Sequence, residues 1–269
     1  MKVLAVGDVV GEEAAHWLAE RMPRLREELD LDWVVVNAEN CAVTGPSPMN
    51  GFGMTLDVVE VLVSSGVDVI TGGNHSWDGP EVDKVLRHPQ VVRPVNLEEQ
   101  LGRGVLTVTG SDGQHISFVN MLSPSAALPD MNAPKPQPLW QAWQRVIAEH
   151  DLAEVIVLDV HGESPWEKAA MASALDGTVS ALVGTHTHDA TFRGHVLPGG
   201  TGYVTELGMT GRLGFTGGGF DPIHFATQFR GEPIDDLPPF DLATGELTLG
   251  AVLLDIDSSG ATTAITRVH

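Results

Sequence analysis

Acidic, amide and imidazole side chains stand at the ends of five short apolar segments of the sequence. The segments read VLAVGD, WVVVNAEN, VDVITGGNH, VIVLDVHGE and SALVGTHTH. The polar residues at their ends are Asp8, Glu39, Asn40, Asn74, His75, His161, His186 and His188. Singly, such residues are ordinary helix caps or turn residues. Together, with almost no Lys or Arg among them, they form a mixed nitrogen and oxygen ligand set for divalent transition metals, so the pattern predicts a metal site.

Two of the imidazoles are separated by only one residue. If the chain stays extended at His186 and His188, both side chains point the same way, and a pair of metal ions can take one each. Glu39 offers two carboxylate oxygens, which makes it the natural bridge between ions about 3.5 to 4 Å apart, the spacing of two-metal phosphoesterase sites. The pattern is therefore typical of a dinuclear centre.

The remaining candidates can complete the two ions. Asp8 would serve one ion, and Asn74 with His161 the other. The one cysteine, Cys41, directly follows Asn40, and we interpret it as a small buried residue and exclude it from the ligands. Without cysteine ligands, an open catalytic site is favoured over a structural zinc site.

An α/β fold is needed to bring these segments together. The first half of the chain alternates short β-branched segments with longer amphipathic stretches at residues 12–29, 55–65 and 79–87. This alternation is typical of parallel strands covered by helices. Ligands of such sheets bind beyond the carboxyl ends of the strands, where the candidate side chains stand.

The second half indicates a second sheet or sheet edge. GVLTVTG and HISFVNML show two-residue alternation and predict a hairpin. A helix with LWQAWQRVIAEH, a strand with EVIVLDV, a helix around WEKAAMASAL and a strand with VSALVGT then resume the βα order. Glycine-punctuated short strands follow residue 190, and a final strand pair is expected before the C-terminus.

Composition excludes several function classes. The chain has 15 Lys and Arg against 36 Asp and Glu, a formal net charge of −21, which disfavours nucleic-acid polymers and anionic lipid as partners. Apolar segments fall short of the roughly 20 residues that a membrane span needs, and a secretory signal is not evident. Walker-type and GxSxG motifs are absent from the sequence. A single cysteine permits no internal disulfide, so a reducing, cytoplasmic location is expected.

The chain resembles a known family in the motifs GDVVG, NAEN, GGNHSWD, DVHGE and GTHTH, and in the later LPGGTGYVTELGMTG. These motifs are similar to those of the calcineurin-like metallophosphoesterase superfamily, specifically its bacterial YmdB-like 2′,3′-cyclic-nucleotide 2′-phosphodiesterase branch. The likeness runs from residue 1 to about residue 265. It implies one metallophosphoesterase domain over residues 1–269 and an α/β fold in which two packed mixed sheets are flanked by helices, a four-layer sandwich.

The resemblance also implies a ligand set for each ion. One ion is assigned to Asp8, Glu39, Asn40 and His188, and the other to Glu39, Asn74, His161 and His186. His75 is left as the catalytic residue, able to donate a proton to the leaving-group oxygen or to stabilise the charge that develops there. The sequence departs from the wider superfamily at Val10, where a metal-binding histidine is usual, and Asn40 is expected to fill that place. Asp78 is expected either to shape the pocket or to cap the following helix.

A dinuclear-metal-dependent phosphodiesterase is the function that the resemblance implies. It would hydrolyse 2′,3′- or 3′,5′-cyclic mononucleotides by attack of a metal-bound hydroxide. Iron or manganese is the expected metal, with zinc as a further candidate, because imidazole and carboxylate suit all three. The alternatives are a phosphomonoesterase, such as a nucleotidase or protein phosphatase, and a non-enzymatic, metal-bound regulator that senses nucleotides. A small phosphodiester is the expected partner, and a homo-oligomer is left open.

Overall fold

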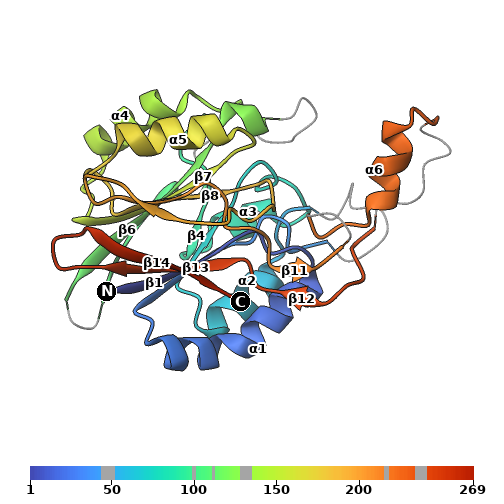
Figure 1. Ribbon diagram of the computed structural model, residues 1–269, viewed down its shortest axis with the longest axis horizontal. Helices are drawn as coiled ribbons and strands as arrows, with labels where there is room; N and C mark the ends of the chain where they lie inside the picture. The colour runs from blue at the N-terminus through green and yellow to red at the C-terminus, as the bar shows by residue number, and fades with distance from the viewer. Residues whose placement is uncertain (44–51, 99–100, 111–112, 128–134, 215–217, 234–240) are drawn as a thin grey trace.

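Two mixed β-sheets face each other at the centre of the fold, and helices cover their outer faces (Figure 1). The computed structural model describes residues 1–43, 52–98, 101–110, 113–127, 135–214, 218–233 and 241–269. Its described strands form two six-stranded sheets and one two-stranded sheet. The predicted fold class, two packed mixed sheets flanked by helices, is confirmed.

The first sheet joins the two ends of the chain. Its strands are β1 (Lys2–Val6), β2 (Trp33–Asn37), β3 (Val69–Thr71), β4 (Val91–Val92), β13 (Ala251–Ile256) and β14 (Thr262–Val268), in the order β14-β13-β1-β2-β3-β4. Strands β1 to β4 are parallel, as the alternation in the first half predicts. The expected final strand pair is the β13–β14 hairpin, and β13 runs antiparallel to β1 with Lys2 opposite Asp255.

The second sheet is built from the middle of the chain. Its strands are β5 (Val105–Thr109), β6 (His115–Leu122), β7 (Val155–His161), β8 (Ala181–Thr185), β9 (His195–Val196) and β10 (Gly202–Val204), in the order β5-β6-β7-β8-β10-β9. The predicted hairpin is β5–β6, and β6, β7, β8 and β10 are parallel. The short strands β11 (Gly211–Arg212) and β12 (Leu247–Thr248) pair separately.

Helices lie on both outer faces. The first sheet is covered by α1 (Glu12–Leu29), α2 (Leu56–Ser65) and α3 (Val82–Leu86), and the second by α4 (Leu139–Glu149) and α5 (Pro165–Ala174) (Figure 1). Side-chain caps start two of them, because Thr55 accepts a hydrogen bond from the Val58 backbone N–H and Ser164 from that of Glu167. In the part of the chain that the structure describes, no helix is long and apolar enough to cross a membrane.

Helix α6 (Pro222–Phe229) was not expected from the glycine-rich stretch around it. It stands away from both sheets (Figure 1). Asp221 caps it by accepting the Ile223 backbone N–H at 2.9 Å, and Pro222 occupies its first turn. This Asp-Pro start is a helix signal that the surrounding glycines obscure.

Successive residues of each strand face opposite sides of the sheet, so each strand contributes side chains to two separate layers of the core. In β1, Leu4 and Val6 pack toward the helices, whereas Val3 and Ala5 pack toward the second sheet. In β7, Val157 lies between the sheets, and its neighbours pack against α4 and α5. Because these strands are buried on both faces, their sequences are continuous runs of apolar residues.

The same alternation places polar residues between the two sheets at the carboxyl ends of their strands. Asn37 pairs in register with Thr71, and His161 with Thr185. All four follow the inward-facing apolar residues by multiples of two. The five polar-ended segments therefore converge between two sheets, with β1, β2 and β3 from one and β7 and β8 from the other, and not at the edge of a single open sheet.

Candidate metal centre

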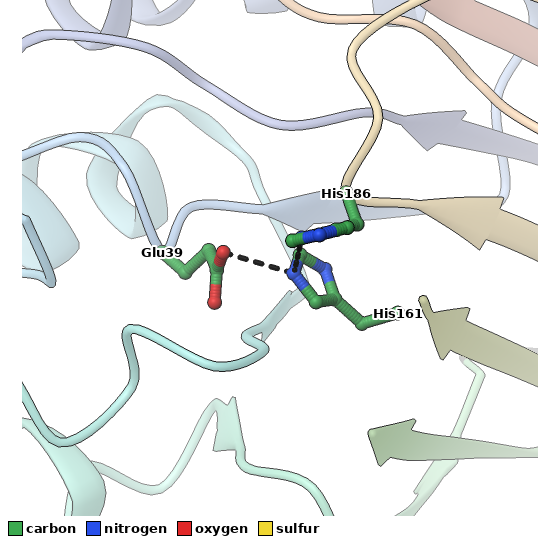
Figure 2. A group of neighbouring side chains, drawn as sticks. All are labelled: Glu39, His161 and His186. Carbon is green, nitrogen blue, oxygen red and sulfur yellow. Dashed lines mark hydrogen bonds and ion pairs between the residues drawn. The ribbon is translucent and has the colours of Figure 1, made fainter. Parts of the chain in front are cut away.

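Glu39, His161 and His186 point toward one another from three separate segments (Figure 2). Their nearest nitrogen and oxygen atoms all lie within 4.8 Å of one another. His161 Nε2 is 3.0 Å from Glu39 Oε1 and 3.0 Å from His186 Nδ1. His161 ends β7, His186 follows β8, and Glu39 follows β2. The structure thus brings together three of the predicted ligands.

Asn74 completes this group. Its Oδ1 atom lies 2.9 Å from the same His161 Nε2. One imidazole nitrogen carries a single proton or a single lone pair, yet it faces a carboxylate oxygen, an amide oxygen and a second imidazole nitrogen. Gly73 makes this approach feasible, since a Cβ there would lie 2.3 Å from the His161 ring. Several ligand atoms directed at one point are the arrangement that a bound cation requires.

Asp8, Asn40 and His188 form a second group beside the first. His188 Nε2 is 3.3 Å from Asn40 Nδ2 and 3.7 Å from Asp8 Oδ1, and the same Asp8 atom is 3.7 Å from His161 Nδ1. Asp8 Oδ1 and Asn40 Oδ1 are buried and have no hydrogen-bond partner in the described part of the chain. Burying such acceptors without a partner is costly, and a cation between them would satisfy both. This donor set therefore fits a metal ion.

In each of the three histidines, the ring nitrogen that points away from the ligand groups contacts a different residue. His161 Nδ1 contacts Thr185 Oγ1 at 2.9 Å, and His188 Nδ1 contacts the Gly218 carbonyl oxygen at 2.9 Å. A carbonyl only accepts, so His188 Nδ1 carries the proton and its Nε2 has the free lone pair. His186 is reversed, because its Nε2 faces Glu163 Oε2 at 3.2 Å. These contacts select the nitrogens that face the two groups.

Asp159 is a buried residue that the sequence analysis missed. Its carboxylate accepts hydrogen bonds from Thr71 Oγ1 at 2.6 Å, Thr185 Oγ1 at 2.7 Å and Asn37 Nδ2 at 3.1 Å. Burial raises its pKa to about 7, against the lowering effect of the two threonine hydroxyls. Through Thr185, Asp159 orients His161. Its signal in the sequence was the two-residue spacing from His161 along β7, which places both side chains between the sheets.

The backbone at the two close histidines is not extended, so that part of the prediction is wrong. β8 ends at Thr185, and His186 and His188 have φ angles of 101° and 62°. The left-handed region costs a non-glycine residue of order 1–3 kcal/mol and persists where its surroundings over-determine it. The turn sends His186 toward His161 and His188 toward Asp8. The two imidazoles consequently reach different groups instead of sharing one strand face.

His75 lies beside the ligand atoms. Its backbone N–H donates to Glu39 Oε2 at 2.9 Å, its Nδ1 is 2.6 Å from Asp78 Oδ2, and its ring stacks on Phe52 at 4.0 Å between centroids. Burial by itself would lower the pKa of His75, but the hydrogen bond with Asp78 and the charge of Glu39 raise it overall. Asp78 therefore contacts His75, and the cap position of α3 is taken by Glu81.

His161 and His186 are neutral at pH 7. Burial lowers the pKa of His161 to about 3 and that of His186 to about 2. Burial raises the pKa of Glu39, with His75 opposing that effect. Neutral imidazole is the form that binds a metal ion, so these two side chains are in the form that a metal site needs.

Exchange of His186 for Gln is expected to reduce the acid sensitivity of the metal-free protein. The folded-state pKa of His186 is depressed from 6.5, so below that pH the unfolded chain binds more protons. The contribution of His186 to the free energy of unfolding is therefore fully present above pH 6.5. As the pH falls below 6.5, this contribution is lost by up to about 1.4 kcal/mol per pH unit. Urea unfolding with EDTA at about pH 7.5 and pH 5 measures the loss. The exposed His16→Gln serves as control, and an equal acid loss in all three proteins would refute the assignment.

Comparisons with known proteins agree with this architecture. A family model described as YmdB-like protein matches residues 4–268. A 2′,3′-cyclic-nucleotide 2′-phosphodiesterase of Bacillus subtilis is 34% identical over 261 residues, covering 96% of this chain and 92% of that protein.

Two solved structures share the fold over the full length of the chain. A crystal structure described as a novel phosphatase, from Mycoplasma pneumoniae, has a TM-score of 0.86 at 27% identity and is covered over 92% of its length. A crystal structure of a hypothetical protein from Thermus thermophilus has a TM-score of 0.82 at 32% identity and is covered over 98%. Both comparisons cover 100% of this chain.

Proposed function

Because the chain belongs to the YmdB-like family of proteins, we propose that it is a metal-dependent phosphodiesterase that hydrolyses cyclic mononucleotides. The observation that carries the proposal is the pair of adjoining ligand groups, the second of which holds two buried oxygens without a partner in the described part of the chain. The Bacillus relative supports the phosphodiester class by its name, and 2′,3′-cyclic nucleotides are accordingly the first substrates to test.

Each ligand group would hold one ion. Asn74, His161 and His186 would hold one, and Asp8, Asn40 and His188 the other, with Glu39 between them. Iron or manganese is the proposed metal, and zinc is a further candidate, because nitrogen and carboxylate ligands suit all three. When bound, two such ions polarise phosphate oxygens and lower the pKa of a water molecule. This accounts for a site built with few cationic side chains.

His75 would act on the leaving group. Its backbone is anchored to Glu39, Asp78 holds Nδ1, and Phe52 covers one ring face. With Nδ1 held by Asp78, Nε2 would be the atom that faces the substrate and donates a proton to the leaving oxygen. For a 2′,3′-cyclic nucleotide, water adds its oxygen to phosphorus, the P–O2′ bond breaks and O2′ receives the proton. The product is a 3′-phosphomonoester.

The net charge of −21 favours a small substrate. Polyphosphate chains are repelled by the summed negative field, whereas a single phosphodiester needs only local contacts at the centre. We therefore propose a mononucleotide substrate and no stable binding of nucleic-acid polymers. Phosphomonoester hydrolysis at the same centre is the second candidate, favoured by the Mycoplasma structure described as a phosphatase.

A rate assay coupled to metal analysis tests the proposal. The purified protein is expected to contain about two transition-metal ions per chain and to hydrolyse 2′,3′-cyclic AMP faster than 3′,5′-cyclic AMP or a linear nucleoside monophosphate. Faster hydrolysis of the linear ester would favour the phosphomonoesterase. Two ions without turnover would favour a metal-bound regulator, and a protein that cannot be loaded with metal would overturn the site.

A further inference from the structure

A lysine and a glutamate are buried together beside the candidate metal centre. Lys168 on α5 places its Nζ atom 3.0 Å from Oε2 of Glu206, which follows β10, and their side chains are 1% and 3% exposed. Neither residue belongs to the proposed ligand groups. Taking two charges out of water is expensive, and well-packed apolar residues often replace such pairs without loss of stability. Stability alone therefore gives no reason for the pair.

The two charged groups also bind the backbone on both sides of His186. Lys168 Nζ donates to the Thr185 carbonyl oxygen at 2.7 Å. Glu206 Oε2 accepts the Thr187 backbone N–H at 3.1 Å and the Thr187 hydroxyl at 2.9 Å. His186 lies between these two attachment points, and its own backbone N–H donates to Asp8 Oδ2 at 3.1 Å.

Gly184 allows the lysine side chain to reach this position. A Cβ at residue 184 would lie 2.7 Å from Lys168 Cδ and 1.9 Å from the Thr205 carbonyl oxygen. The aliphatic part of Lys168 thus crosses β8 at its one glycine, and the ammonium group emerges at the turn that carries the histidines. The glycine of the GTHTH motif serves this crossing.

We propose that Lys168 and Glu206 are positioning residues that hold the Thr185–His188 turn in its strained conformation. This inference rests on the proposed function, because the turn carries one ligand of each ion. His186 and His188 both adopt positive φ angles, which a histidine leaves unless its surroundings prevent it. Fixing Thr185 and Thr187 keeps His186 Nδ1 directed at the first ligand group and His188 Nε2 at the second. The pair thereby sets metal affinity and not only stability.

Replacing both charged residues by apolar ones distinguishes an effect on metal affinity from an effect on stability. In Lys168→Met/Glu206→Leu, the desolvation cost is removed together with the attachment of the turn. Thermal unfolding in EDTA is expected within a few degrees of the intact protein, whereas either single substitution should unfold at lower temperature because it leaves one buried charge unpaired. Equilibrium dialysis with Mn²⁺ is expected to show about 10- to 100-fold weaker binding by the double variant. Its kcat at saturating Mn²⁺ should also be lower.

A surface pair provides the matched control. Lys84 and Glu81 have the same 3.0 Å separation, with side chains 66% and 30% exposed. Lys84→Met/Glu81→Leu is expected to bind Mn²⁺ as the intact protein does. Unchanged Mn²⁺ affinity in the folded Lys168→Met/Glu206→Leu variant would overturn the inference and leave the proposed function standing. An intact protein that binds none of Mn²⁺, Fe²⁺ and Zn²⁺ would overturn both.

A milder substitution decides the matter if the double variant does not fold. Thr187→Val removes only the hydroxyl that donates to Glu206 and keeps the backbone N–H and the side-chain shape. It is expected to unfold at the same temperature in EDTA and to bind Mn²⁺ several-fold more weakly than the intact protein. Equal affinity in this variant would overturn the positioning role.

Discussion

Exchange of His75 for Ala is expected to lower kcat on 2′,3′-cyclic AMP by about 10²- to 10⁴-fold, the usual contribution of a general acid. The metal content should stay at that of the intact protein, because the His75 side chain contacts Asp78 and Phe52 and leaves the ligand atoms to other residues. Its backbone bond to Glu39 survives the substitution. Elemental analysis and steady-state rates on the same preparation measure both quantities.

Asp78→Asn is the companion to this variant. Asp78 raises the pKa of His75, and a proton donor loses activity as the pH rises through its pKa. The neutral side chain should therefore move the alkaline loss of activity to lower pH, with the metal content unchanged.

Unchanged turnover in His75→Ala would contradict the proton-donor role. It would favour the regulator hypothesis if Asp8→Ala, which should lose metal, abolished the biological output.

Exchange of Glu39 for Gln is expected to have opposite effects on the metal-free and metal-loaded protein. Glu39 is buried, and burial raises its pKa, so the carboxylate is costly without a cation. Gln keeps the size and an acceptor for the His75 N–H but removes the charge. The metal-free variant should unfold at the same or a higher temperature than the metal-free intact protein. Mn²⁺ affinity should fall by more than about 100-fold, beyond the effect of groups that only orient ligands.

Thermal unfolding with EDTA and with added Mn²⁺ measures both effects. A bound ligand stabilises in proportion to the logarithm of its concentration over Kd, so Mn²⁺ should raise the unfolding temperature of the intact protein and hardly that of Glu39→Gln. Exposed Glu28→Gln, on α1, is the control and should respond to Mn²⁺ as the intact protein does. An undiminished Mn²⁺ shift in Glu39→Gln would remove this residue from the ligand set.

Local sequence determined the elements and the position of the chemistry along them. Apolar β-branched runs predicted β1, β2, β3, β7 and β8. Each carries the predicted site residues at or just beyond its carboxyl end, because parallel strands buried on both faces hold mainly apolar residues before it. Helix α6 was missed, since its Asp-Pro start stands among glycines that favour turns. The assignment of ligands and of His75 stays a prediction that the experiments above test.

The tertiary structure decided the orientation of the site residues, because it depends on contacts between residues that lie far apart in the sequence. Which nitrogen of each histidine faces the ligand groups depends on contacts with Thr185, Glu163 and Gly218, of which only Thr185 and Glu163 are near a histidine motif in sequence. The turn at His186 and His188 departs from the extended path because Lys168 and Glu206 hold its backbone, although they lie 17 and 19 residues from the threonines that they bind. Residue types and their spacing reveal which groups can bind a metal. Their orientation is set by long-range hydrogen bonds and packing, which only the folded chain brings into contact.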